Sequence, residues 1–373
     1  MKIKNLLELL YEEAPLSWQE DYDNSGLNIG DPEASTESVL VCLDVTEAVI
    51  DEAIEKRCGL IISHHPLVFH GIKQLVPKGP VERAVIKAVR AGIAIAAMHT
   101  NLDNSMKGVN KKIAEKLGLT QVNALQPFAG RLKKLATFCP ADHAETVRNA
   151  IFAAGGGNIG EYSSCSFNSE GTGTFKAGQH TNPFVGEKGK IHYEAETRIE
   201  TIVPDHLLQR VVDAMIAAHP YEEVAYDIYP LDNSYDAAGT GAIGVLEKTL
   251  TETELIEHIA HVFQTKVLRY SALTGKPIQK LAVCGGAGVF LLQSAIRAGA
   301  DAFVTADVKY HDFFEADNKL LLIDAGHYET EQYTIELIAE ILRKKIPNFA
   351  VHISEVNTNA VNYFSSRNTE IIS

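Results

Sequence analysis

The chain has 373 residues, of which 46% are hydrophobic and 22% are charged. This length favours two lobes or one domain that carries an insertion, and this composition excludes a largely disordered chain. The excess of 48 Asp and Glu residues over 34 Lys and Arg residues gives a formal charge of −14. Because such a charge repels phosphate backbones and anionic lipid, we expect no direct nucleic-acid partner and no membrane partner.

The N-terminal segment, residues 1–15, predicts an amphipathic helix rather than a secretion signal, because Glu8 interrupts its apolar stretch. No apolar run reaches the length of about 18 residues that a membrane span needs. The five cysteines are scattered and never spaced as C-x-x-C, which argues against disulfides and against a thiolate zinc site. These features favour a cytoplasmic location.

The first third of the chain alternates short apolar strands with helices. Strands are expected at residues 37–45, 58–63 and 91–98, and helices at residues 46–57 and 80–91. The last third repeats this pattern, with strands at residues 280–286, 301–307 and 319–326 and helices at residues 289–299 and 331–346. Such alternation predicts parallel strands joined by crossover helices, and therefore an α/β fold.

The middle of the chain contains an internal repeat, in which residues 137–167 align with residues 201–229. Each copy predicts a strand, a turn that contains proline, a helix and a second strand. Two such units form a ferredoxin-like α+β sandwich, and the Gly-rich stretch at residues 170–190 predicts a hairpin or a mobile loop between them. We therefore expect an inserted domain at residues 129–237, flanked by segments 1–128 and 238–373 that together form one α/β domain.

Imidazoles and carboxylates follow the predicted strands in clusters. They are His64 and His65, then His99 and Asp103, and finally His327 and Glu331. Because ligands bind beyond the carboxyl ends of the strands in open α/β sheets, these clusters are expected to share one crevice.

The spacing within the clusters indicates a site for two metal ions. His327 and Glu331 are four residues apart at the expected first turn of the last helix, so they share one face, whereas Glu329 points elsewhere. The adjacent His64 and His65 diverge in extended backbone and therefore suit two ions better than one. Asp103 and Glu331 supply negative charge, and Glu331 is expected to bridge the ions.

Simpler explanations exist for each cluster taken alone. Asp103 could cap a helix that begins near Met106, and His327 with Glu331 could form a surface pair. Metal binding is favoured because the same residue types recur after several apolar strands. His99 and His311 either line the site, as proton carriers or as partners of the ligands, or form local hydrogen bonds. Asp44 either orients a ligand or caps the next helix.

Two glycine motifs do not indicate nucleotide binding. Residues 239–244 match G-x-G-x-x-G, but a strand rather than a helix is predicted to follow them, which excludes a dinucleotide fingerprint. Residues 285–288 lie between a predicted strand and a predicted helix, where backbone amides can bind a phosphate. They lack the Gly-Lys-Ser/Thr of a P-loop, so tight packing is the favoured explanation.

The motifs SHHP at residues 63–66, HTNLD at 99–103 and GHYETE at 326–331 resemble, in this order, the signature of the Nif-three-like family, also called the GTP cyclohydrolase 1 type 2 homologues. Residues 23–31 and 299–312 also resemble segments of this family. The resemblance implies that His64, His65, Asp103, His327 and Glu331 bind two metal ions, with Glu331 shared by both. It also implies a homohexamer and an inserted domain of the PII or CutA type.

Two functions remain open from the sequence. The first is a metal-dependent hydrolase that acts on a small phosphorylated or heterocyclic substrate, such as a nucleotide, with two ions of Zn²⁺, Fe²⁺ or Mn²⁺. The second is a non-enzymatic, oligomeric metal-binding protein with a regulatory or scaffolding role.

Overall fold

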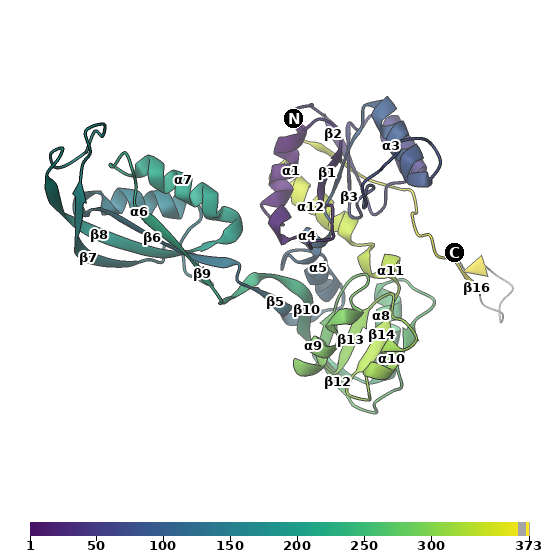
Figure 1. Ribbon diagram of the computed structural model, residues 1–373. Coiled ribbons are helices and arrows are strands. Elements are labelled where there is room, and N and C mark those ends of the chain that lie inside the picture. Colours follow the sequence, from purple (N-terminus) through teal and green to yellow (C-terminus); the bar gives the residue numbers. More distant parts are fainter. Residues whose placement is uncertain (365–370, 373) are drawn as a thin grey trace. The chain divides into compact units, whose positions relative to one another are not determined.

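The computed structural model describes residues 1–364, 371 and 372, and it divides into two compact units (Figure 1). The larger unit combines Met1–Pro127 with Asp236–Ser373, and the smaller unit is Phe128–Tyr235. The smaller unit is therefore an insertion in the larger one. Across the described residues, no helix has both the length and the apolar character that crossing a bilayer requires.

The first sheet of the larger unit has the strand order β1-β4-β3-β2-β15. Its strands are β1 (Gly26–Ile29), β2 (Ser38–Cys42), β3 (Leu60–Ser63), β4 (Ala94–Ala97) and β15 (Ala350–Ile353). Strands β15, β2, β3 and β4 are parallel, which confirms the prediction for the first third, and β1 runs antiparallel to β4.

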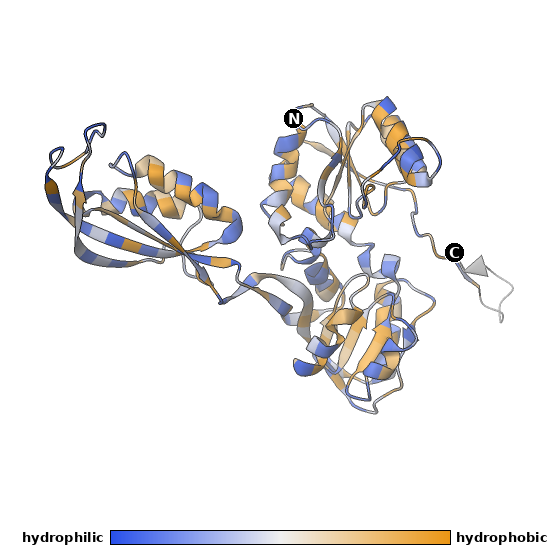
Figure 2. Ribbon diagram, in the orientation of Figure 1, coloured by the Kyte–Doolittle hydropathy of each residue, from blue (hydrophilic) through white to orange (hydrophobic). Residues whose placement is uncertain are grey.

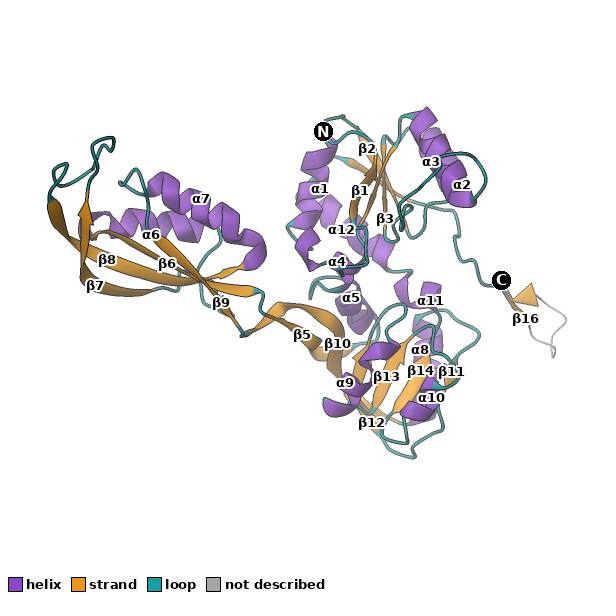
Figure 3. Cartoon of the chain, in the orientation of Figure 1, coloured by secondary structure: helices purple, strands orange, loops and turns teal. Residues whose placement is uncertain are grey.

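Helices cover both faces of this sheet (Figure 3). Val39 and Val41 point to the core that α1 (Ile3–Tyr11), α5 (Val109–Lys116) and α12 (Thr334–Lys345) share. Leu40 lies between them and points to α2 (Glu47–Glu55) and α3 (Pro80–Ala91) on the other face. Each face is apolar because both are buried, as expected for parallel strands.

The second sheet has the order β11-β14-β13-β12-β10-β5. Its strands are β5 (Leu119–Ala129), β10 (Ser234–Leu250), β11 (Arg269–Tyr270), β12 (Ile278–Val283), β13 (Ala302–Thr305) and β14 (Leu321–Asp324). Strands β12, β13 and β14 are parallel, as predicted. One face packs into the core shared with the first sheet, together with α8 (Glu252–Val262), and the other packs against α9 (Leu292–Arg297).

The insertion is one antiparallel sheet with two helices on one face. The strand order is β7-β8-β6-β9, from β6 (Leu132–Pro140), β7 (Phe167–Lys176), β8 (Ile191–Pro204) and β9 (Tyr226–Leu231). Helices α6 (Ala144–Ala153) and α7 (Leu208–Ala218) connect them, and Figure 2 shows apolar and polar residues alternating along both. The pairing of β7 with β8 confirms the hairpin predicted for the Gly-rich stretch.

The shorter elements lie at the ends of the strands. They are η1 (Leu16–Trp18), α4 (Thr100–Asp103), η2 (Ala141–His143), η3 (Asp205–Leu207), η4 (Val289–Leu291), α10 (Asp312–Glu315), α11 (His327–Glu331), β16 (Tyr363–Phe364) and β17 (Ile371–Ile372). The predicted single helix at residues 331–346 is wrong in one respect. His327 and Glu331 belong to the separate short helix α11, which ends before α12 begins.

Candidate metal centre

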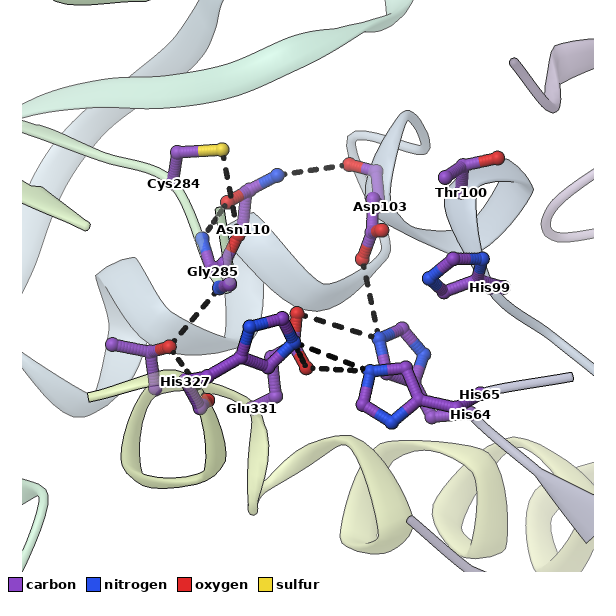
Figure 4. Close-up of polar contacts among 12 residues, drawn as sticks. His64, His65, His99, Thr100, Asp103, Asn110, Cys284, Gly285, His327 and Glu331 are labelled. Carbon is purple, nitrogen blue, oxygen red and sulfur yellow. Dashed lines mark hydrogen bonds and ion pairs between the residues drawn. The ribbon is translucent and has the colours of Figure 1, made fainter. Parts of the chain in front are cut away.

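Side chains from three parts of the larger unit, which follow two strands of the first sheet and one strand of the second, meet in one cluster (Figure 4). The pair His64 and His65 directly follows β3, the short helix α4 follows β4, and α11 follows β14. The structure brings together all five residues that the sequence singled out as metal ligands, and His99 lies with them: His64, His65, Asp103, His327, Glu331.

His64 is completely buried, and its two ring nitrogens have different environments. Nδ1 lies 2.8 Å from the carbonyl oxygen of Met98, to which it donates a hydrogen bond. Nε2 therefore carries a lone pair, and it lies 3.7 Å from Asp103 Oδ1 and 3.7 Å from Glu331 Oε1 without a hydrogen bond to any described residue. A buried lone pair beside two carboxylates is an unfavourable arrangement unless a cation lies between them.

His65 and His327 repeat this arrangement. Nδ1 of His65 lies 2.7 Å from Asp44 Oδ1, and Nδ1 of His327 lies 2.8 Å from Asp307 Oδ2. The Nε2 atoms of the two rings are 3.4 Å apart, and they lie 3.0 and 3.1 Å from Glu331 Oε2. The aspartates fix the ring tautomers, as partners of metal-binding histidines commonly do.

His99 completes the cluster from the side of β4. Its Nδ1 lies 2.6 Å from Asp23 Oδ1, and its ring centroid lies 5.3 Å from that of His64 and 5.4 Å from that of His65. One ligand atom from each of these three histidines lies within 4.8 Å of the other two. The same limit holds for the ligand atoms of His65, His327 and Glu331.

Glu331 lies at the centre of the cluster and is only 3% exposed. Its Oε2 accepts no hydrogen bond from a described residue. The loop after β12 makes room for it, because a Cβ atom on Gly286 would lie 2.3 Å from Glu331 Oε1. Gly286 also has a φ of +59°, a left-handed conformation that favours glycine. The tight packing predicted for this glycine loop is therefore confirmed, and the packing partner is Glu331.

The pKa values of the clustered side chains are shifted by burial and by the charges of their neighbours. Burial and the neighbouring Glu331 raise the pKa of Asp103 to about 7. Burial lowers the pKa of His65, but Asp44 and Glu331 more than compensate and raise it to about 10. The pKa of His327 rises to about 9 because Glu331 and Asp307 outweigh the effect of burial. The carboxylates thus attract positive charge, and a metal ion can replace the protons on the imidazoles.

Several sequence-based alternatives are decided by this geometry. Asp103 does not cap the following helix, because the N-cap of α5 is Gly108. Asp44 contacts His65, whereas Thr46 caps α2. His311 is exposed, its ring contacts Tyr310 and Phe314, and the structure does not bring it to the cluster. The Glu329 carboxylate accepts a hydrogen bond from Asn359 instead.

Sequence reasoning missed three groups that support the cluster: Asp23, Asp307 and the contact between Gly286 and Glu331. Asp307 lies two residues after the end of β13, so the strand-end rule could have identified it. Asp23 precedes β1, and it reaches the same edge because β1 runs antiparallel to β4. No pattern in the sequence predicts that β1 runs antiparallel to β4. Imidazole and carboxylate donors, with buried and unpaired lone pairs, fit a divalent transition-metal ion.

Comparison with known proteins agrees with this fold and site. The family model described as Duf34/NIF3 (NGG1p interacting factor 3) matches residues 1–360. A Halalkalibacterium halodurans protein named GTP cyclohydrolase 1 type 2 homolog is 40% identical, with 96% of this chain and 98% of that protein covered. A Bacillus subtilis protein of the same name is 38% identical, with 95% and 97% covered.

Solved structures extend the comparison to the fold. A Bacillus cereus protein related to NIF3 has a TM-score of 0.87 at 37% identity, with 98% of this chain and 99% of that chain covered. A Staphylococcus aureus protein has a TM-score of 0.75 at 29% identity, with the same shares covered. The match of a family model to nearly the whole chain, together with these relatives, shows that this protein belongs to the Duf34/NIF3 family.

Proposed function

We propose that this centre holds two divalent metal ions with Glu331 between them. The supporting observation is that the donors fall into two sets around the two oxygens of one carboxylate. His64 Nε2 faces Oε1 of Glu331 together with Asp103, whereas the Nε2 atoms of His65 and His327 face Oε2. His99 lies beside His64 and His65, at the edge of the first set.

The proposed activity is hydrolysis of a small phosphorylated or heterocyclic substrate, with a nucleotide as the first choice. Two bound ions would supply an activated water and polarise the bond that the water attacks. His99 is the residue we assign to proton transfer, since Asp23 orients its ring and it is not enclosed between carboxylates as His64 is. The name of the two curated relatives, GTP cyclohydrolase 1 type 2 homolog, supports a nucleotide.

The second candidate function is a non-enzymatic metal-binding protein that acts through assembly. The insertion favours this alternative. Its sheet order, β7-β8-β6-β9, and its two helices support the proposal that it is a ferredoxin-like domain of the PII or CutA type. A homohexamer, implied by the motif resemblance, belongs to the same proposal. The five free cysteines support a reducing, cytoplasmic location.

Metal content tests the centre directly. We expect protein purified without chelator or added metal to contain two equivalents of Zn, Fe or Mn per chain by elemental mass spectrometry. Glu331→Gln should lose most of this metal, because a neutral amide cannot balance two dications. Glu329→Gln is the matched control, since it makes the same change two residues away on α11 while the side chain bonds to Asn359. Equal metal content in both variants would contradict the proposed centre.

Activity and assembly separate the two functions. Protein loaded with each metal should hydrolyse at least one member of a panel of nucleotides and phosphoesters, and Glu331→Gln should abolish this turnover without changing the mass of the assembly in light scattering. A fully loaded protein without turnover would contradict the hydrolase. A change of assembly in Glu331→Gln would favour the second function.

A further inference from the structure

The inserted unit contains a pocket of about 630 Å³ that lies entirely within its own residues. It is formed by the free face of the sheet, opposite α6 and α7, and by two segments that follow β7 and α7. Its lining includes Phe138, Gly171, Phe175, Phe184, Glu196 and Tyr221.

Strand alternation places the floor of this pocket on the face away from the helices. Leu135, Cys139 and Ile199 point into the core beneath α6 and α7. Phe138 and Arg198 pair across β6 and β8 and therefore point the opposite way. Glu196 lies two residues before Arg198 on β8 and shares that face.

Two glycines in β7 leave the pocket open. Gly171 pairs with Glu196, and a Cβ atom built on it would meet nothing within 4 Å. A Cβ atom on Gly173 would lie 2.0 Å from Glu196 Oε2. Neither glycine has a positive φ, so backbone conformation does not require them. Glycine within a strand often marks close approach of a ligand, and here the space above Gly171 is empty of protein atoms.

Aromatic rings form the walls. The ring of Tyr221 lies 6.2 Å from that of Phe175 and 6.3 Å from that of Phe184, measured between centroids. The backbone N–H of Asn182 donates a hydrogen bond of 2.7 Å to Glu222 Oε1, which joins the two segments that cover the sheet. The rings are thus held around the space above β7 and β8.

The pocket lining has an excess of negative charge, because its carboxylates outnumber its cationic side chains. Glu196 accepts a hydrogen bond of 2.9 Å from the Tyr221 hydroxyl, and no described residue forms an ion pair with it. Arg198 pairs with Glu200 at 2.6 Å and lies over the ring of Phe138. The full set of charged residues in the lining contains four carboxylates and two cations: Glu170, Glu196, Glu222, Glu223, Lys176, Arg198.

We propose that this pocket binds a small organic cation, an ammonium or guanidinium compound, with the positive group between the Glu196 carboxylate and the surrounding aromatic rings. A carboxylate gives such a cation an ionic partner, and aromatic faces attract it through their quadrupoles. Concave sites lined by apolar rings with a few placed polar groups are typical of small-molecule binding. An anion would face uncompensated carboxylates, and a neutral ligand would leave Glu196 without a counter-charge.

The test is calorimetric titration of the full-length protein with two probes, agmatine and choline. At least one should bind. Gly171→Leu should weaken binding at least tenfold by filling the space above β7, and Glu196→Gln should do so by removing the charge. Tyr221→Phe, which keeps the ring, should weaken binding less than Glu196→Gln. Glu194→Gln is the matched control, because it lies on the same face of β8 but outside the pocket.

The result that would overturn the proposal is failure of both probes to bind, or binding that survives both Gly171→Leu and Glu196→Gln. Tighter binding of pentanoate than of agmatine would also overturn it, since it would assign the pocket to anions. The metal content of each variant should equal that of the unmodified protein. This readout shows that the larger unit is folded and keeps the result independent of the metal centre.

Discussion

Three histidines of the candidate metal centre are held in place by hydrogen bonds of Nδ1, the ring nitrogen that faces away from the cluster. The Nδ1 atom of His64 is hydrogen-bonded to a backbone carbonyl oxygen, that of His65 to the Asp44 carboxylate, and that of His327 to the Asp307 carboxylate. Each of these bonds selects the tautomer that leaves a lone pair on Nε2. Partners of this kind commonly change metal affinity by about 10- to 100-fold when they are removed. The candidate centre therefore includes these partners as well as the proposed ligands.

Gly286 offers a sharp test at this scale. We expect Gly286→Ala to weaken metal binding roughly tenfold or more, equivalent to about 1.4 kcal/mol, because its Cβ would displace the Glu331 carboxylate. The measurement is competition with a chelator of known affinity. The left-handed backbone should also cost about 1 to 2 kcal/mol of stability in denaturant unfolding of the metal-free protein.

Gly299→Ala is the control for this strain. Gly299 has a φ of +70°, and a Cβ atom on it would meet nothing within 4 Å. It should lose a similar amount of stability and keep its metal affinity. If both variants lost metal equally, general destabilisation rather than contact with Glu331 would be the cause.

At the scale of elements, hydrogen bonds connect the segment that follows β15 to helix α2. The carboxylate of Glu52 accepts hydrogen bonds from the Ser354 hydroxyl and from the backbone N–H of Glu355, and it pairs with Lys56. Burial alone would raise the pKa of Glu52, but these partners lower it below its ordinary value. The ionised form is thus the one that holds the segment to the helix.

The sign of the pH dependence follows. Because folding lowers the pKa of Glu52 from its ordinary value of 4.5, its contribution to stability is complete above that value and is lost as the pH falls through the folded pKa. We expect Glu52→Gln to reduce the free energy of unfolding at pH 7, with a smaller reduction at pH 3.5. The measurement is urea unfolding of metal-free protein at both pH values.

Glu55→Gln controls for the loss of a carboxylate from the same helix, since Glu55 is exposed. It should change the unfolding free energy little at either pH. An equal loss at both pH values in Glu52→Gln would show that the hydrogen bonds, not the charge, account for its role.

On the scale of the whole molecule, the insertion and the metal centre occupy separate units. The insertion leaves and returns through β5 and β10, which are neighbours in one sheet. All the residues of the metal centre lie in the larger unit, and its core joins both sheets. We therefore expect the larger unit to fold by itself and to hold the proposed metal ions without the insertion.

Excision tests this independence. A chain in which a short Asn-Gly turn replaces Phe128–Tyr235 should fold cooperatively and bind as much metal per chain as the full-length protein, because the turn joins adjacent strands. Circular dichroism and elemental analysis are the measurements, with Glu331→Gln in the shortened chain as the negative control. Loss of metal from a folded shortened chain would show that the insertion contributes to the centre.

The sequence by itself determined the parallel strands, their crossover helices and the residues that follow the strand ends. These features depend on the period of apolar residues and on the rule that functional side chains lie at the carboxyl ends of parallel strands, both of which are local properties. The helix predicted at residues 80–91 has the same bounds as α3, which spans Pro80–Ala91. The boundary between α11 and α12 was not predictable from the same period.

Only the tertiary structure decided which groups meet. Asp23 reaches His99 because β1 is antiparallel to β4. Gly286 meets Glu331 because β12 and β14, which precede them, lie in one sheet with only β13 between them. Gly171 leaves a pocket because β7 pairs with β8 in one register. His311 follows a strand as the proposed ligands do, yet it is exposed and its ring contacts Tyr310. The physical reason is that convergence depends on packing between segments far apart in the chain, which no local pattern encodes.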